Sequence, residues 1–200
     1  KLKELGYKGR FVTFGSVFEM GETHEERFFT EKDVLTSTCP APNDYTVSKR
    51  MLSSFVSSYK HDFTHWHFYI PTIYGAGENP KRLIPYVINA IRNGEELHFT
   101  AGDQTRQYVH VSEVPRMLAL AFEKNLPSGL YNIQGKETVT VKEIVTEIHH
   151  AMGKEVPDGC FGSVQRADVG MKYLALDGKK LHDATGFEAS IKITDVIDTY

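Results

Sequence analysis

The chain has 200 residues, 40% of them apolar and 24% charged, which suits one globular domain with a small second lobe. Its net charge of −3 argues against a broad nucleic-acid-binding surface, and no apolar run reaches the roughly 18–20 residues that a membrane span requires. We therefore expect no nucleic-acid partner and no membrane attachment. The composition needs no disulfide to stabilise it, so we also expect a cytoplasmic location.

The N-terminal residues predict a helix end, a strand and a loop. Residues 1–9 are typical of the end of a helix that closes on Gly6, so we expect the chain to begin inside a domain. The β-rich run at 10–14 predicts a strand that ends at Gly15-Ser16. Residues 19–43 are polar and interrupted by glycine and proline, which predicts a long surface loop.

A helix is predicted from the capping residues Asn43 and Asp44 to about residue 60. Apolar side chains at helical spacing predict one apolar stripe along it, made of Leu52, Phe55, Val56 and Tyr59.

Strands and helices alternate over the rest of the chain. We expect strands at 65–70, 96–100, 106–111 and 129–133, and helices at 82–93, 112–124, 140–152 and 177–186, with a last helix beginning at 191. Pro71 should end the pairing of the first of these strands, and Thr140 with Glu143 forms a capping box. This alternation indicates an α/β protein.

The sharpest chemical feature is Tyr45-x-x-x-Lys49 on the predicted helix. Side chains four residues apart share one face of a helix. A lysine ammonium beside a phenol favours the phenolate, so such a tyrosine can give or take a proton near neutral pH. The motif is short and frequent by chance, and its significance depends on its neighbours.

Several neighbouring motifs, in order along the chain, resemble the extended short-chain dehydrogenase/reductase family. In that family a strand ends in Ser or Thr a few residues before a Tyr-Gly pair; here Ser16 precedes Met20-Gly21, and Tyr45-x-x-x-Lys49 follows about thirty residues later. Later segments also resemble family landmarks, namely those at 70–75, 82–86, 102–111, 131–133 and 177–187.

The resemblance implies an α/β fold: the C-terminal part of a Rossmann-like doubly wound parallel sheet plus a small α/β substrate-binding lobe. Residues 1–75 would form the C-terminal half of the dinucleotide-binding Rossmann domain. Residues 76–200 would mainly form the nucleotide-sugar-binding lobe, with some segments returning to the Rossmann sheet. The family's GxxGxxG phosphate loop is absent from this sequence. We therefore expect that loop to precede Lys1, and this chain alone to bind the dinucleotide poorly.

The same resemblance implies hydride chemistry at a sugar carbon, with NAD or NADP as cofactor. Tyr45 would act as the acid/base on the sugar oxygen, and Ser16 would hydrogen-bond the same oxygen. Lys49 would bind the nicotinamide ribose and favour the phenolate. Tyr45, Lys49, Pro71 and Ile73 would line the cofactor site.

A nucleotide-diphosphate sugar is the implied substrate, and its diphosphate requires cations. Arg106 stands where the family's phosphate-binding arginine falls, although Gln107 replaces the aspartate that commonly follows it. Arg82 and Leu83 begin the helix that meets the nucleotide-sugar. Arg166 opens a pattern like the family's late Arg-x-x-Asp, one residue short.

The reaction itself stays open between two alternatives. Family dehydratases carry an Asp-Glu pair where this chain has Val17 and Phe18, so a 4,6-dehydratase is disfavoured. Epimerisation at C4 and reduction of a keto-sugar need the same catalytic residues, and the sequence does not separate them. Tyr69 replaces the usual arginine before Pro71, which leaves the substrate open.

Other classes of function also remain. The protein can be a non-catalytic or truncated nucleotide-sugar-binding relative, or a reductase of a non-sugar carbonyl. We expect the full-length protein to be a homodimer. No metal site is expected, because the histidines have no set of Cys, Asp or Glu partners at ligand spacing. Cys39 and Cys160 lie far apart and are expected to be reduced thiols.

Overall fold

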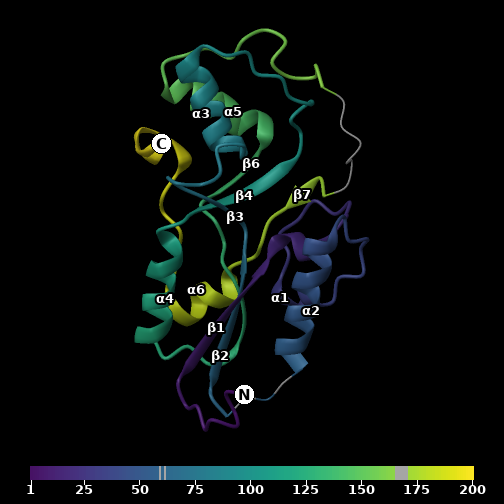
Figure 1. Ribbon diagram of the computed structural model, residues 1–200, viewed down its shortest axis with the longest axis vertical. Helices are drawn as coiled ribbons and strands as arrows, with labels where there is room; N and C mark the ends of the chain where they lie inside the picture. Colours follow the sequence, from purple (N-terminus) through teal and green to yellow (C-terminus); the bar gives the residue numbers. More distant parts are fainter. Residues whose placement is uncertain (59, 61, 165–170) are drawn as a thin grey trace.

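The computed structural model describes residues 1–58, 60, 62–164 and 171–200 (Figure 1). Its strands are β1 (Arg10–Ser16), β2 (Thr64–Ile70), β3 (Thr72–Tyr74), β4 (Thr105–His110), β5 (Gly129–Asn132), β6 (Glu137–Thr140) and β7 (Tyr173–Leu174). Its α-helices are α1 (Glu31–Leu35), α2 (Asp44–Ser58), α3 (Leu83–Asn93), α4 (Glu113–Glu123), α5 (Val141–Ala151) and α6 (Lys179–Thr185). Two 3-10 turns, η1 (Val17–Met20) and η2 (Ile193–Thr199), also lie within these described ranges.

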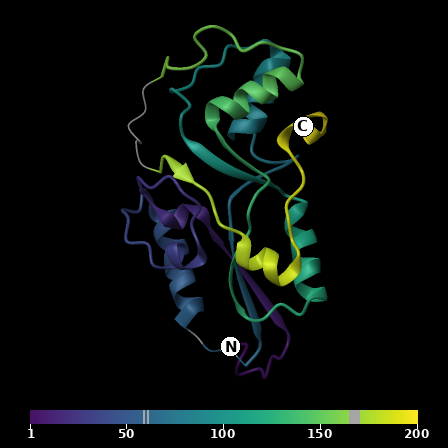
Figure 2. The ribbon, with the colours of Figure 1, turned by 180° about the vertical axis from the view of Figure 1, so that it is seen from behind.

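The first sheet is parallel, with the strand order β1-β2-β5. Its register pairs Ser16 at the end of β1 with Ile70 at the end of β2, so two carboxyl ends lie side by side. In both ribbon views, α1 and α2 lie on one flank of these strands, and α4 and α6 lie on the other (Figures 1 and 2). Open α/β sheets bind their ligands at such carboxyl ends.

Pro71 marks the passage of the chain from the first sheet to the second. As expected from its missing N–H, pairing in β2 stops at Ile70, and β3 begins at Thr72. In the second sheet β4 pairs in parallel with β3 and β7 and antiparallel with β6. Helices α3 and α5 pack on this sheet together with η2 (Figure 1).

Two main apolar cores hold these layers. One lies between the second sheet, α3, α5 and η2, and includes Tyr108, Ile88 and Ile144. The other lies between the first sheet and helices α4 and α6, and includes Phe68 and Met117. The parallel first sheet and the helices packed on it give the chain a mixed α/β fold of the Rossmann type, as expected.

Most elements lie where the sequence predicts them, and the capping box of Thr140 and Glu143 at the start of α5 is confirmed. Residues 19–43 are not a continuous loop, because Thr30 and Asp33 form a second capping box that starts α1. The strand expected at 96–100 is reduced to an isolated bridge at Phe99.

The predicted apolar stripe of α2 is buried only in part. Phe55 is 58% exposed, whereas the buried side chains of this helix are Thr46 and Ser53. Tyr59, the last member of that stripe, lies outside the described residues. Among the helices that the structure describes, none is long and apolar enough to cross a bilayer.

Candidate active site

Ser16 ends β1 and caps the short turn η1 that follows it. Its Oγ accepts a 3.2 Å hydrogen bond from the backbone N–H of Phe18, and its own N–H donates to Glu19 Oε1 at 2.8 Å. Among the described contacts, the hydroxyl of Ser16 acts only as an acceptor. Because a serine hydroxyl has one proton to donate, that proton remains available to an oxygen atom outside the turn.

Tyr45 and Lys49 lie in the first turns of α2, which begins directly after Asn43. Asn43 Oδ1 accepts a 3.0 Å hydrogen bond from the N–H of Thr46 and so caps the helix. The Lys49 Nζ atom lies 5.8 Å from the centre of the Tyr45 ring and donates a 2.9 Å hydrogen bond to the carbonyl oxygen of Phe14. Half of the Tyr45 side chain is exposed, so its phenol can meet a ligand.

A cavity of about 510 Å³ lies over these groups at the carboxyl ends of β1 and β2. It brings together six of the residues predicted from the sequence, which are Ser16, Tyr45, Lys49, Pro71, Ile73 and Arg82. The residues predicted to be catalytic and cofactor-binding therefore share one cavity, although they come from three separate parts of the chain.

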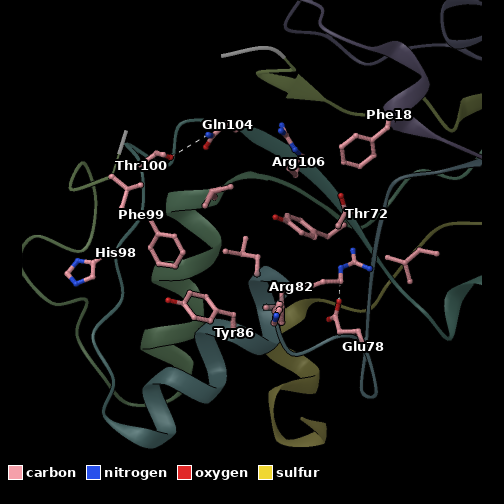
Figure 3. Close-up of a pocket in the computed structure, with 17 residues that line it drawn as sticks. Phe18, Thr72, Glu78, Arg82, Tyr86, His98, Phe99, Thr100, Gln104 and Arg106 are labelled. Carbon is pink, nitrogen blue, oxygen red and sulfur yellow. Dashed lines mark hydrogen bonds and ion pairs between the residues drawn. The ribbon is translucent and has the colours of Figure 1, made fainter. Parts of the chain in front are cut away.

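A second cavity, of about 490 Å³, adjoins the first and is shown in Figure 3. The two cavities share Phe18, Thr72, Ile73 and Arg82 as lining residues. The second is also lined by Leu83 and Arg106, two more of the predicted substrate residues. Each volume lies within the range of roughly 300–1,000 Å³ that is common for small-molecule sites.

Arg82 precedes α3 and belongs to both cavities, and a partly buried carboxylate holds it there. Its Nε lies 3.2 Å from Glu78 Oε2 (Figure 3). The other oxygen of Glu78 accepts hydrogen bonds from the Tyr200 hydroxyl at 2.6 Å and from the N–H of Gly75 at 3.4 Å. Burial and the neighbouring Glu78 carboxylate raise the pKa of Tyr200, so its hydroxyl stays a donor. Arg82 is thus oriented by Glu78, whose carboxylate is itself held by Tyr200 and Gly75.

Arg106 reaches the second cavity from β4. Its Nη1 donates a 2.8 Å hydrogen bond to the carbonyl of Thr105. Burial raises the pKa of Tyr108, which lines the same cavity, to about 12, so the cavity wall there is a neutral phenol. The adjacent Gln107 points elsewhere: its side-chain amide binds the backbone of Leu176 through two 3.2 Å hydrogen bonds. Gln107 therefore joins β4 to the segment after β7.

The cavity in Figure 3 has a cationic side and an aromatic side. Arg82 and Arg106 lie toward one side, and the rings of Tyr86 and Phe99 lie toward the other with 6.3 Å between their centres. Thr100 and Gln104 add polar groups along this wall. Sequence reasoning missed the aromatic side, because nothing in the sequence indicates that α3 and residues 98–104 meet at one cavity. Arg166, the remaining predicted substrate residue, lies outside the described residues.

The residues present suit one end of a nicotinamide dinucleotide. Lys49 uses one of its three N–H donors on Phe14, and Tyr45 stands exposed beside it, which leaves donors for ribose hydroxyls. The glycine-rich loop that a pyrophosphate requires is absent from the sequence. The described residues of this cavity therefore suit the nicotinamide ribose end of the dinucleotide.

Comparison with known proteins identifies the family and the fold. The sequence model described as the NAD dependent epimerase/dehydratase family matches residues 2–133. CDP-abequose synthase of Salmonella typhimurium is 22% identical over 191 residues, an alignment that covers 90% of this chain and 59% of that protein.

Solved structures with the same fold extend the comparison. A dTDP-glucose 4,6-dehydratase from Bacillus anthracis, crystallised with NAD, has a TM-score of 0.80 at 18% identity, and covers 100% of this chain and 63% of its own. WbmG of Bordetella bronchiseptica, in complex with NAD and UDP, has a TM-score of 0.77 at 18% identity, and covers 99% of this chain and 59% of its own. The chain thus spans about 60% of the length of these relatives.

Proposed function

The chain belongs to the NAD-dependent epimerase/dehydratase family, and we propose that it is the catalytic, sugar-binding part of a nucleotide-sugar epimerase or keto-sugar reductase. The observation that carries the proposal is the single cavity shared by Ser16, Tyr45 and Lys49, which adjoins a second cavity lined by two arginines. The first cavity supplies acid/base groups, and the second supplies cations for a diphosphate.

Each catalytic side chain has one role in this proposal. Tyr45 exchanges a proton with the reacting sugar oxygen, and its exposed phenol supports that role. Ser16 donates its free hydroxyl proton to the same oxygen and holds it in place. Lys49, fixed by its bond to Phe14, binds the ribose of the cofactor and stabilises negative charge on Tyr45. The cofactor, NAD or NADP, supplies or accepts the hydride at the sugar carbon when bound.

Arg82, directly before α3, and Arg106, in β4, would together neutralise the diphosphate of the substrate. Guanidinium groups bind such oxygens through paired, charge-assisted hydrogen bonds. Leu83 would pack beside them. The rings of Tyr86 and Phe99 would face the nucleoside, because flat aromatic surfaces stack on bases.

Dehydration is the family reaction that these residues support least. The two positions after Ser16 hold Val17, which is buried, and Phe18, which lines both cavities. Neither can transfer a proton. Glu19, the next residue, carries a carboxyl group, but that group binds the N–H of Ser16 and does not line either cavity. The proposal is therefore restricted to epimerisation or reduction.

We further propose that the full-length protein is a homodimer. The solvent face of α2 carries three apolar side chains at intervals of four residues, Val47, Met51 and Phe55, each between 45 and 69% exposed. Such a stripe supports helix packing against a second copy.

The test of the proposed function is turnover by the full-length protein with NAD or NADP and a panel of nucleotide-sugars and 4-keto-sugars. Tyr45→Phe should lower kcat by roughly 10²–10⁴-fold, the usual worth of a general acid/base group. Tyr7→Phe, far from both cavities, serves as the matched control and should retain activity. Unchanged turnover in Tyr45→Phe would refute the proposed role.

A second candidate is a non-catalytic nucleotide-sugar-binding protein, because the two arginines of the second cavity can bind a diphosphate whether or not a hydride is transferred. This second candidate predicts that the protein binds UDP or another nucleoside diphosphate but turns over no nucleotide-sugar with any cofactor. A related reductase of non-sugar carbonyls would instead keep its turnover in the Arg106→Ala variant.

A further inference from the structure

The sheet face beneath α2 is polar. Along a strand, alternate side chains point to opposite faces. Phe14 and Phe68 point toward the core against α4, whereas Thr13 and its register partner His67 point toward α2. His67 is 1% exposed, so α2 covers most of this polar face.

Helix α2 adds a matching polar row. Tyr45, Lys49, Ser53 and Ser57 are spaced by four residues and therefore lie along one side of the helix, over about 18 Å at 1.5 Å per residue. Ser53, in the middle of this row, is buried, and its hydroxyl lies 3.0 Å from His67 Nε2. The side of α2 that carries Tyr45 and Lys49 thus also places the hydroxyl of Ser53 in the interior, where it can form hydrogen bonds.

These groups form an unbroken chain of hydrogen bonds from Ser53 to His65. The Oγ1 atom of Thr13 lies 2.8 Å from His67 Nδ1 on one side and 2.8 Å from His65 Nε2 on the other. A hydroxyl oxygen can accept one proton while it releases another, and an imidazole can accept a proton at one nitrogen and release one from the other. We call the set of Glu19, Ser53, His67, Thr13 and His65 the polar layer.

Glu19 is the end of the polar layer nearest the candidate active site. It is fully buried, and its Oε1 accepts the N–H of Ser16. Its Oε2 is buried without a hydrogen-bond partner among the described residues. Burial raises the pKa of Glu19, while the Ser53 hydroxyl, the Ser16 N–H, and the charges of Lys49 and Arg50 lower it. The net effect is a raised pKa, which favours the protonated form of Glu19 relative to an ordinary glutamate.

Gly15 is the point where the polar layer meets the cavity of Tyr45. It lines that cavity, and a Cβ atom placed on it would lie 2.6 Å from Glu19 Oε1 and 2.7 Å from His67 Nε2. Only a residue without a side chain leaves room for both groups.

The opposite end of the polar layer opens to a separate cavity of about 560 Å³. Its lining residues include His65, His67 and Ser57, the last member of the helical row. The polar layer therefore spans the distance between two cavities at opposite ends of α2.

We propose that the polar layer is a proton relay that delivers a solvent proton from the His65 cavity to Lys49 and Tyr45, and that it marks the protein as a keto-sugar reductase. The inference rests on the proposed function and narrows it. An epimerase returns its proton to Tyr45 within one turnover and needs no net supply. A reductase consumes one proton per turnover.

The proton balance is as follows for reduction of a ketone. The carbonyl carbon gains a hydride from reduced nicotinamide, and its oxygen gains a proton from Tyr45, which leaves a phenolate. Lys49 returns a proton to that phenolate, and Glu19 returns one to Lys49. One proton then passes from the cavity through His65, Thr13, His67 and Ser53 to Glu19, so the net change is the uptake of one solvent proton.

The surroundings of the relay favour the neutral forms of its side chains. Burial, with the nearby His65 and Lys49, lowers the pKa of His67 to about 4, so its imidazole is neutral at pH 7. Burial also raises the pKa of Tyr69, the next α2-facing residue of β2, while the Ser53 hydroxyl lowers it and the carboxylates of Glu19 and Glu31 raise it further. Neutral His67 can take a proton on one nitrogen and release it from the other.

The first test is a stopped-flow measurement on the full-length protein with reduced nicotinamide and a nucleotide keto-sugar. Hydride transfer is followed by nicotinamide absorbance and proton uptake by a pH indicator. Ser53→Ala should keep the first hydride transfer near the wild-type rate but slow proton uptake and later turnovers by about ten-fold or more. Imidazole buffer should restore them.

Two variants serve as controls for this test. Ser54→Ala removes an exposed serine one residue along α2 and should behave as wild type, and Ser53→Thr should restore the hydroxyl function. If later turnovers of Ser53→Ala match those of Ser54→Ala, or if the wild type turns substrate over without net proton uptake, the relay is refuted.

A second readout does not depend on activity. Exchange of the His67 ring N–H with water, measured by NMR, should be slowed about ten-fold by Thr13→Val, which removes the link to His65 while keeping the side-chain shape. A purely structural role predicts the opposite, because a broken hydrogen bond promotes local opening and faster exchange. Faster or unchanged exchange would refute the relay even if the protein proved to be no nucleotide-sugar enzyme.

Discussion

The Nζ atom of Lys49 donates a 2.9 Å hydrogen bond to the carbonyl oxygen of Phe14, which ties α2 to the carboxyl end of β1. Its acceptor, Phe14, lies two residues before Ser16 in the chain, and its donor, Lys49, lies one helical turn after Tyr45. The bond therefore fixes the position of the Lys49 ammonium group relative to Ser16 and Tyr45 in the cavity. The contact has consequences for stability as well as for the proposed chemistry.

Replacing Lys49 by Met should separate these consequences. Loss of the hydrogen bond should lower the free energy of unfolding by about 1 kcal/mol, because the Phe14 carbonyl loses its donor. Loss of the ammonium should raise KM for the nicotinamide cofactor and lower kcat by at least about ten-fold. Urea unfolding and steady-state kinetics measure the two effects. Lys32→Met, on the exposed side of α1, is the control, and equal kinetics in the two variants would contradict the role of Lys49.

Arg106→Ala and Arg82→Ala should each weaken binding of a nucleoside diphosphate by about 10–100-fold, the worth of a charge-assisted hydrogen bond. The measurement is calorimetric titration with UDP, CDP, dTDP and GDP. Arg92→Ala, at the exposed end of α3, should bind as the wild type does. Wild-type affinity in both cavity variants would place the diphosphate elsewhere.

Glu78→Gln should weaken the same binding indirectly. The neutral amide loses the ion pair to Arg82, and the Tyr200 hydroxyl loses a charged acceptor. We expect KM for the nucleotide-sugar to rise several-fold, roughly 3–10-fold, with kcat little changed, because only ground-state positioning is affected. A fall in kcat at constant KM would contradict this role.

The buried His67 should make the protein less stable in mild acid. Its pKa is about 4 in the folded state, below the ordinary 6.5, so the unfolded chain binds more protons between these values. Stability should therefore fall as pH falls from 6.5 through 4, by at most about 3 kcal/mol from this group. His67→Gln should flatten that part of the curve. Urea unfolding at several pH values measures it, and a curve as steep as that of the wild type would contradict the assignment.

The exposed stripe of α2 predicts the oligomeric state. If Val47, Met51 and Phe55 pack against a second copy, Met51→Glu should convert a dimer of the full-length protein into a monomer, because it buries a charge without a partner. Analytical ultracentrifugation measures the change. Leu5→Glu, at an equally exposed apolar residue far from α2, is the control. A wild-type monomer at all concentrations would contradict the proposed dimer.

Much of the architecture could be predicted from local sequence signals. The capping box of Thr140 and Glu143, the break at Pro71 and the start of α2 are encoded within a few residues. For the same reason, the four-residue spacing of Tyr45 and Lys49 sufficed to place them on one helix. The order of the motifs along the chain then indicated the family.

The face that α2 buries could be decided only by the tertiary structure. Apolar spacing predicted that Phe55 would be buried, because that argument assumes an apolar partner surface. The register of β1 and β2 instead turns Thr13 and His67 toward the helix, so Ser53 is buried and Phe55 is exposed.

The sequence by itself thus determined the α/β elements and the residues able to move a proton. The tertiary structure decided which of them meet. Strand register and helix docking brought Ser16 beside Tyr45 and set Arg82 near Arg106, and they linked His67 to Ser53. Contacts between residues far apart in the chain depend on how whole layers pack, and local patterns of polarity carry no information about that packing.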